Sequence, residues 1–375
     1  MGFAIASIGG PLALAAIYVP GAGDPRSAGL LALLGAALYA LPLAVWLRYS
    51  DEIVSAGGLA AFVEAAVGRR AALVQAAVWS LSYFLYLPYT VTDVVYEQLG
   101  KIFPGLEPWR PALEVVLPLG IVGLVLLPKT TVLRVLLVSA GAQLVLVLVL
   151  GFVMLRHTGT TPSSFTHVAS THGLLRGSAN VSLLFLCGSL PLFLGAEVVG
   201  GARAVRQALV VAGVVVAGYV VFAAWPLAAV DPTLAHADLP GYAIANAFSG
   251  RALAIAVGVG AAVSVTGLIV AEYLALSRLL NVVTRIPVRR LLAWIGVPFV
   301  AVDALSLIDP HEFDENVLRP SLIALFLSQL IVFAVFPLYR ARRAKLTPLD
   351  VLIAAGALAL MAWGLYRAVV EPVST

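Results

Sequence analysis

The sequence predicts an all-α integral membrane protein with about eleven transmembrane helices. Of its 375 residues, 61% are hydrophobic and only 11% are charged, and the mean hydropathy is +1.02. Soluble domains carry about 25% charged residues. Apolar runs of about 20 residues, the length that crosses a bilayer as a helix, recur along the chain. Two of these runs are interrupted by glycine and proline at corresponding places, which indicates an internal repeat.

Composition excludes several kinds of site. The single cysteine, Cys187, cannot form an intramolecular disulfide or a cysteine metal cluster. The net charge of +4 is small, so we expect no nucleic-acid partner. The five histidines lie in predicted loops, and the Gly-x-Ser-x-Gly and His-Glu-x-x-His motifs of hydrolases and metalloproteases do not occur. We therefore expect no enzyme, no metal site and no cofactor.

Polar or amphipathic segments separate the predicted spans. The spans cover residues 2–20, 28–47, 72–99, 111–128, 133–155, 178–200, 207–230, 251–280, 290–308, 318–338 and 349–369. With the N-terminus inside, most lysine and arginine residues fall on the inner face, including the cluster 340–345. We therefore predict a multi-pass protein of the cell membrane with a cytoplasmic N-terminus and an extracellular C-terminus.

Corresponding features recur almost half a chain apart. Gly10 in the first interrupted run and Gly188 in the second are 178 positions apart. Because each copy holds five spans, the two copies must cross the membrane in opposite directions. We predict a first five-helix repeat over 1–155, a second, inverted repeat over 178–338, and an extra C-terminal transmembrane helix over 349–369. Inverted repeats with interrupted helices are typical of secondary transporters, which bind substrate at the midplane between the interruptions.

The first interruption is Ser7-Ile8-Gly9-Gly10-Pro11. Glycine costs roughly 1 kcal/mol and proline roughly 3 kcal/mol relative to alanine inside a helix. Freed backbone at membrane depth is tolerated only where protein covers it or where it lines a wet cavity. An unwound helix here would point its amides and the positive end of the next half-helix at the midplane, which suits a substrate carboxylate. The alternative is close helix packing through small residues.

The second interruption runs from Cys187 to Pro191 and includes Gly188 and Ser189. If the helix opens here, carbonyl groups of its outer half can accept hydrogen bonds from a substrate ammonium group. Cys187 and the nearby Phe185 are candidates to face the pocket. The alternative for Phe185 is contact with lipid.

Three motifs resemble the amino acid–polyamine–organocation superfamily. Residues 55–69, which begin Ser-Ala-Gly-Gly and end Gly-Arg, are similar to its loop after the second span. Glu197, followed by Gly-Gly-Ala-Arg over 200–203, resembles its glutamate and Asn-Pro-x-Arg motif, with Gly-Ala in place of Asn-Pro. Ser277-Arg278 fits its Ser-Arg signature at the end of the eighth span. The resemblance implies the ten-helix inverted-repeat fold of the bacterial leucine transporter, with one extra span.

The resemblance also implies roles for two polar residues. Tyr83, the deepest tyrosine of a stripe in the third span, would meet the substrate carboxylate, unless the stripe only packs against other helices. Gln143 stands where some proton-coupled relatives carry a lysine, so its amide would instead bridge the first span to the fifth or eighth span. The alternative is a buried amide bonded to a neighbouring helix.

Residues of the eighth span complete the candidate coupling or gating set. Ser264 and Thr266 correspond to hydroxyls that bind sodium in sodium-dependent relatives. They are two positions apart and do not share a helix face, which argues against a sodium site. Glu272 is expected to pair with an arginine of the inner face, such as Arg203, and a proton-carrying role is the alternative.

These features predict a secondary active transporter of amino acids that works by alternating access around the two interruptions. Because no charged residue is expected at the midplane, a neutral or apolar amino acid fits better than a charged one. Proton symport, exchange and sodium symport are the coupling modes, in that order. Two alternatives stay open: a transporter-like sensor that binds without flux, and a permease for other organic amines. The expected partners are the substrate, the proton and the lipid bilayer.

Overall fold

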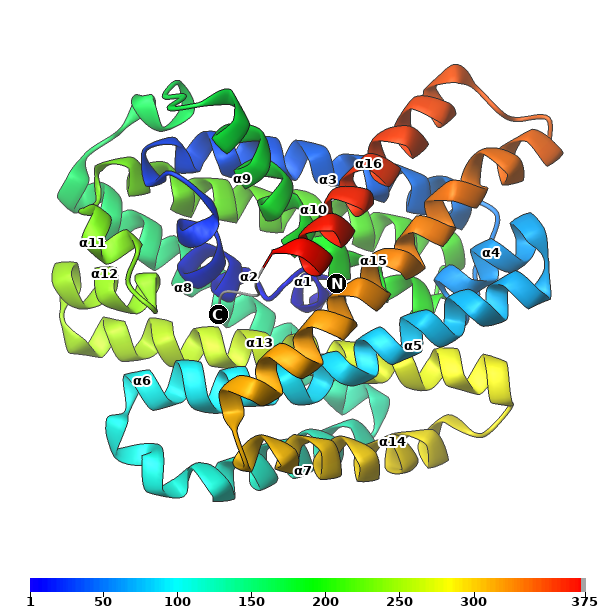
Figure 1. The fold of residues 1–375 in the computed structure, drawn as a ribbon, viewed down its shortest axis with the longest axis horizontal. Helices are drawn as coiled ribbons and strands as arrows, with labels where there is room; N and C mark the ends of the chain where they lie inside the picture. Colours follow the sequence, from blue (N-terminus) through cyan, green and yellow to red (C-terminus); the bar gives the residue numbers. More distant parts are fainter. Residues whose placement is uncertain (372–375) are drawn as a thin grey trace.

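The computed structural model describes residues 1–371, and these form a helical bundle with no strand among them (Figure 1). The long helices of the first half are α3 (Ala28–Ser50), α5 (Arg69–Thr92), α7 (Arg110–Leu126) and α8 (Lys129–Thr158). Those of the second half are α9 (Thr171–Leu184), α10 (Gly201–Ala224), α13 (Arg251–Thr284), α14 (Val288–Asp303), α15 (Pro310–Arg342) and α16 (Pro348–Val370). The short helices are α1 (Gly2–Ser7), α2 (Pro11–Ala13), α4 (Leu59–Val67), α6 (Gly100–Ile102), α11 (Pro232–Ala235) and α12 (Pro240–Ser249).

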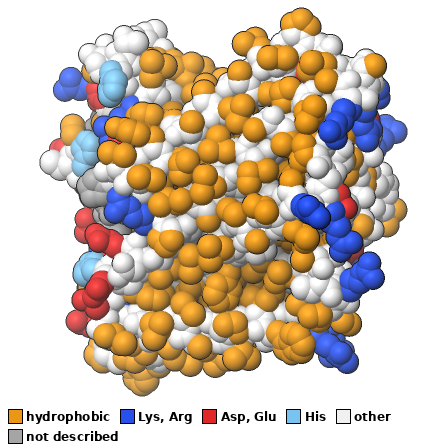
Figure 2. All heavy atoms as spheres, turned by 45° about the vertical axis from the view of Figure 1, so that its right-hand side comes forward, with side chains coloured by type: hydrophobic (Ala, Val, Ile, Leu, Met, Phe, Trp, Pro, Cys, Tyr) orange, Lys and Arg blue, Asp and Glu red, His pale blue; other side chains and the backbone are white. Residues whose placement is uncertain are grey.

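The bundle has the surface of a multi-pass membrane protein. Ten of the described helical segments are long and apolar enough to cross a membrane. Hydrophobic side chains cover the middle of the surface in Figure 2. Lysine and arginine gather at one edge, and acidic and histidine side chains, together with some lysine or arginine, gather at the other. We call these edges the basic face, which includes the cluster 340–345, and the acidic face, which includes the loops 231–239 and 309–312.

The first predicted span is divided into α1, α2 and η1 (Leu14–Tyr18), so it does not count among the ten long segments. Gly9 and Gly10 separate α1 from α2, with φ angles of 58° and 65°, a region that residues with a Cβ rarely adopt. Pro11, which has no N–H to leave unbonded, opens α2. The predicted interruption is therefore present, and the N-terminal end of α1 lies near mid-depth of the bundle (Figure 1). The predicted side of each terminus stays a prediction.

The second interruption differs from the expected unwound stretch. The helix α9 ends at Leu184, and the chain continues as the 3₁₀-helix η7 (Leu186–Glu197) rather than as open backbone. The change of helix type also begins before Cys187, whereas the sequence predicted an interruption that starts at Cys187. A 3₁₀-helix has a rise of about 2.0 Å per residue and bonds residue i to i+3, so the second half of this span is thinner and longer than an α-helix.

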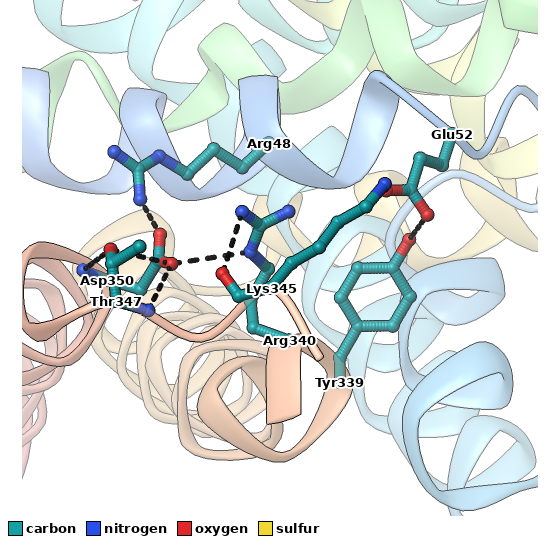
Figure 3. Close-up of polar contacts among 7 residues, drawn as sticks. All are labelled: Arg48, Glu52, Tyr339, Arg340, Lys345, Thr347 and Asp350. Carbon is teal, nitrogen blue, oxygen red and sulfur yellow. Dashed lines mark hydrogen bonds and ion pairs between the residues drawn. The ribbon is translucent and has the colours of Figure 1, made fainter. Parts of the chain in front are cut away.

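The last helix, α16, is fixed at the basic face by a buried carboxylate (Figure 3). Asp350 has no exposed surface and forms ion pairs with Arg48 of α3 and with Arg340 of α15, the latter at 3.4 Å. It also accepts hydrogen bonds from the amide and hydroxyl of Thr347, at 3.0 and 2.9 Å, which cap the helix. The extra helix is thus joined to both neighbouring spans at its start.

Candidate functional site

A cavity of about 410 Å³ lies between the first interrupted span, α5, α9, α13, α15 and α16. It extends from Gly9 to Gly21 and Ala22, which follow the first span on the acidic-face side. Its wall is mostly apolar. The aromatic and polar side chains in the wall are Tyr18, Ser82, Tyr83, Tyr86, Tyr89, Asn180, Cys187, Glu272, Phe326, Arg367 and Glu371. A space of this size suits a small organic molecule with a large apolar part.

The two interruptions meet beside this cavity. A Cβ on Gly9 would lie 2.7 Å from the carbonyl oxygen of Leu184, the last residue of α9. A Cβ on Gly10 would lie 2.5 Å from the hydroxyl oxygen of Ser264 in α13. Within residues 1–371, neither the Gly9 nor the Gly10 amide donates a hydrogen bond. Glycine is therefore needed for the close approach of the spans, and two polar groups are left available.

The nine predicted substrate-binding residues divide into two groups. Gly9, Tyr83 and Cys187 line the cavity. Ser7, Ile8, Gly10, Phe185, Gly188 and Ser189 do not line it and are fully or almost fully buried. Their part in binding stays a prediction.

Local contacts explain why two of the predicted side chains are turned away from the cavity. The Ser7 hydroxyl donates to the Ala4 carbonyl oxygen at 2.9 Å, the usual bond of a serine within a helix. Phe185 has no exposed surface and packs against Tyr39 of α3, with ring centroids 5.3 Å apart. It contacts neither lipid nor the cavity.

Gln143 and Ser264 connect three spans beneath the first interruption. The Ser264 hydroxyl donates to the Gln143 carbonyl oxygen at 2.6 Å and accepts from the Ala13 amide at 3.5 Å. Both side chains are buried. Thr266 instead donates to the Ala262 carbonyl oxygen of its own helix at 2.9 Å. Gln143 thus bonds to the eighth span, and Ser264 connects that span to the first. Their role in coupling stays a prediction.

Glu272 lies in the cavity wall, not at the inner face as expected. The Tyr83 hydroxyl donates to the Cys187 sulfur at 3.8 Å, and the Cys187 thiol donates to Glu272 Oε1 at 3.6 Å. Glu272 Oε2 is buried and has no hydrogen-bond partner among the described residues. The predicted ion pair with Arg203 is therefore wrong, and the cavity wall contains an ionisable side chain that the sequence analysis did not place there. The apolar surface of α13 gives no indication of which of its faces is turned inward.

A cluster of charged residues from α16 was not predicted. Arg367 donates to the Asn180 side chain of α9 at 2.6 Å and to Glu371 at 2.6 Å. Arg176 also donates to Glu371, at 2.9 Å. The hydrogen bond from Arg367 holds the pKa of the Glu371 carboxyl below its usual range. The only sequence signal for this contact was an arginine and a glutamate four positions apart at the end of the last span.

At the basic face, a second cluster holds η7 against α13. Arg278 is 5% exposed and donates to Glu197 at 3.1 Å. Lys129, at the start of α8, donates to the same carboxylate at 3.0 Å. The structure thus pairs Glu197 and Arg278, which the sequence motifs singled out separately. These contacts hold the basic-face end of the sixth span, where the three side chains also line a second cavity of about 490 Å³. The first cavity extends toward the acidic face.

Comparison with known proteins identifies the arrangement of the helices. MhsT, crystallised in complex with L-phenylalanine, is 15% identical and aligns over 98% of this chain and 97% of its own, with a TM-score of 0.64. The manganese transporter of Eremococcus coleocola, in complex with an aromatic bis-isothiourea substituted compound, is 13% identical and aligns over 97% of this chain and 87% of its own, with a TM-score of 0.59. The chain has the leucine-transporter fold. No protein-family model and no curated protein matches the sequence.

The leucine-transporter fold confirms the predicted class of inverted five-plus-five helix architecture. In this fold, the divided helix α1–α2 and the pair α9–η7 are the first and sixth spans. The predicted limits of the two repeats and of the extra helix stay predictions. The identities are too low to transfer a substrate or a coupling ion from either neighbour.

Proposed function

We propose that the protein is a secondary active transporter of neutral or apolar amino acids that works by alternating access around the interrupted first and sixth spans. One observation carries the proposal. The interruptions meet beside a cavity that Gly9 lines, and the Gly9 and Gly10 amides form no hydrogen bond within the described residues. Backbone amides at the start of a half-helix favour a carboxylate, and the aliphatic and tyrosine wall favours an apolar side chain.

The electrostatics of the site fit a zwitterion. The carboxylate of an amino acid would bind the amides of the first interruption. Its ammonium group would face the carbonyl groups at the end of α9. We thus keep the neutral substrate, but for a different reason. The sequence favoured it because no charged residue was expected at the midplane, whereas the cavity wall does contain an acidic residue, Glu272. We place the basic face in the cytoplasm, following the positive-inside rule, so the cavity opens toward the outside.

Glu272 also favours a second candidate, a permease for organic amines that lack a carboxylate. A thermal-shift screen of the purified protein separates the candidates, because a ligand stabilises the folded state in proportion to its occupancy. Neutral amino acids are expected to raise the melting temperature more than the corresponding amines. The screen is run at two pH values, with and without sodium. If only amines stabilise the protein, the proposed substrate is an organic amine and not an amino acid.

Substitution of Gly10 tests the site itself. Gly10→Leu places a side chain against Ser264 and into a backbone with positive φ, so uptake of radiolabelled neutral amino acids by proteoliposomes is expected to fall to background. Gly120→Leu is the matched control, because Gly120 is exposed and a Cβ there meets nothing within 4 Å. If Gly10→Leu takes up substrate as wild type does, the first interruption is not needed for transport and the proposed site is wrong.

A membrane sensor with this fold would bind the same ligands without flux. Cys187 is the only cysteine of the chain and lines the cavity, so its alkylation by N-ethylmaleimide reports occupancy. A transporter is expected to show both protection of Cys187 by amino acids and uptake into vesicles. Protection without uptake would favour the sensor.

A further inference from the structure

We propose that Glu272 carries the coupled proton of this transporter, so that its side chain is a neutral carboxylic acid while the substrate and the proton cross the membrane together. The inference rests on the transport function proposed above and adds the identity of the coupling ion and of the residue that holds it. It is carried by the surroundings of one side chain at the centre of the bundle.

The Glu272 carboxyl is more isolated than its position in the cavity wall suggests. Its side chain has no exposed surface, and Oε2 has no hydrogen-bond partner among the described residues. Its one polar contact is the Cys187 thiol, at 3.6 Å from Oε1. A thiol is a weak donor, and an ionised carboxylate without better partners is strongly disfavoured inside a membrane protein.

The neighbouring elements supply no cation that pairs with this carboxylate. Arg367 of α16 lines the same cavity, but it bonds to Glu371 and Asn180. The titratable groups that face it are Cys187 from η7, and Tyr83 and Tyr86 from α5. The helices α1 and α2 contain no titratable side chain. The charged residues of α5, α7, α8 and α14 lie within the first or last two turns of those helices, whereas Glu272 lies well inside α13. A proton is therefore the cation that can neutralise it in place.

The same geometry favours a proton over the substrate ammonium group. Because the carboxyl has no exposed surface, a bulky cation cannot reach it without displacing the wall. Tyr83 and Cys187 form a chain of hydrogen bonds to Oε1, at 3.8 and 3.6 Å, along which a proton can be exchanged with water in the cavity. Protonation converts the Glu272 carboxylate to the acid, and no other bond changes.

The coupling follows from the filling of the cavity. While the cavity contains water, Glu272 exchanges its proton through Cys187 and Tyr83. Substrate that fills the cavity expels this water, so the proton on Glu272 crosses with the substrate and leaves on the other side. Replacement of the carboxyl by a neutral amide should therefore permit exchange of substrate but uncouple it from the proton gradient.

The test uses full-length protein in proteoliposomes with a mixture of radiolabelled neutral L-amino acids. A gradient of about one pH unit supports up to about tenfold accumulation for one coupled proton. Wild-type protein is expected to show both counterflow exchange and gradient-driven accumulation. Glu272→Gln is expected to retain counterflow. It should bring the substrate inside the vesicles only to the concentration outside, without gradient-driven accumulation.

The matched control is Glu114→Gln. Glu114 also has no exposed surface, but it belongs to α7 and does not line the cavity. This variant is expected to retain gradient-driven accumulation. If Glu272→Gln accumulates substrate as wild type does, the inference fails while the transport function stands. If wild type shows neither counterflow nor accumulation, the transport function fails and the inference fails with it.

Infrared difference spectra on addition of substrate give a second readout that does not depend on flux. Wild type is expected to show the C=O stretch of a protonated carboxylic acid, retained in Glu114→Gln and lost in Glu272→Gln. Absence of this band from substrate-bound wild-type protein would overturn the inference even if Glu272→Gln does not fold.

Discussion

Asp350 and Glu272 are both carboxyls without exposed surface, but their surroundings are opposite. Asp350 forms ion pairs with two arginines and accepts two hydrogen bonds from Thr347, so its negative charge is compensated (Figure 3). Glu272 has a thiol and no cation among the groups that face it. The comparison distinguishes a carboxyl that holds helices together from one whose charge must change.

The two carboxyls also lie in different parts of the bundle. Asp350 lies at the basic face, where the loop from α15 to α16 brings arginines from two helices within reach. Glu272 lies well inside α13, among spans whose charged residues lie near their ends. A buried ion pair is costly to break because its partner is left unpaired, whereas a buried lone carboxyl is stable only in its neutral form. Stability measurements on isosteric amide variants therefore test the distinction.

Asp350→Asn is expected to have the largest effect on stability. The variant leaves Arg48 and Arg340 without their shared carboxylate, which should cost roughly 3–5 kcal/mol of unfolding free energy. Chemical denaturation in mixed micelles measures the loss. Asp51→Asn is the control at the same face, because Asp51 pairs with Arg206 at an exposed site and should cost about 0.5 kcal/mol. Equal effects of the two variants would contradict the assigned role of Asp350.

Glu197→Gln is expected to have an intermediate effect. Arg278 is nearly buried and would lose a charged hydrogen-bond partner, at a cost of about 1.5–3 kcal/mol. The same change should loosen η7 from α13 and open the basic-face end of the sixth span, which increases alkylation of Cys187 from that side in oriented vesicles. Lys129→Met, which removes only the exposed partner, should cost about 0.5 kcal/mol. A larger loss for Lys129→Met than for Glu197→Gln would reverse this assignment.

Glu272→Gln is expected to have the smallest effect on stability, despite its loss of coupling. A neutral acid and an amide have nearly the same shape, so the unfolding free energy should change by less than about 1 kcal/mol. The same denaturation experiment measures it at neutral pH. A loss as large as that of Asp350→Asn would show that Glu272 is a paired structural charge and would remove the contrast between the two carboxyls.

Much of the arrangement could be predicted from local sequence. The spans follow from runs of about 20 apolar residues, and the first interruption follows from Gly9, Gly10 and Pro11, because these residue types disfavour a helix wherever they occur. The second interruption was predicted less well. Gly188 and Pro191 lie within η7, and the α-helix had already ended at Leu184, whose carbonyl group lies against Gly9.

The candidate site was predicted only in part, for a related reason. Gly9, Tyr83 and Cys187 line the cavity as expected, but Phe185 is turned toward Tyr39. In a helix that is apolar on all sides, periodicity does not identify the inward face. The rotation of each span, and hence the side chains that face the cavity, depends on packing against other spans.

The sequence by itself determined the membrane class, the helical content, the approximate spans and the first interruption, because hydrophobic length and glycine–proline chemistry act over a few neighbouring residues. Only the tertiary structure decided the groups that meet across the bundle: Tyr83, Cys187 and Glu272 at the cavity, Glu197 with Arg278, and the end of α16 in the cavity wall. These contacts join residues that are far apart in the chain. They depend on the rotation and depth of whole helices, which the packing of all the spans sets together.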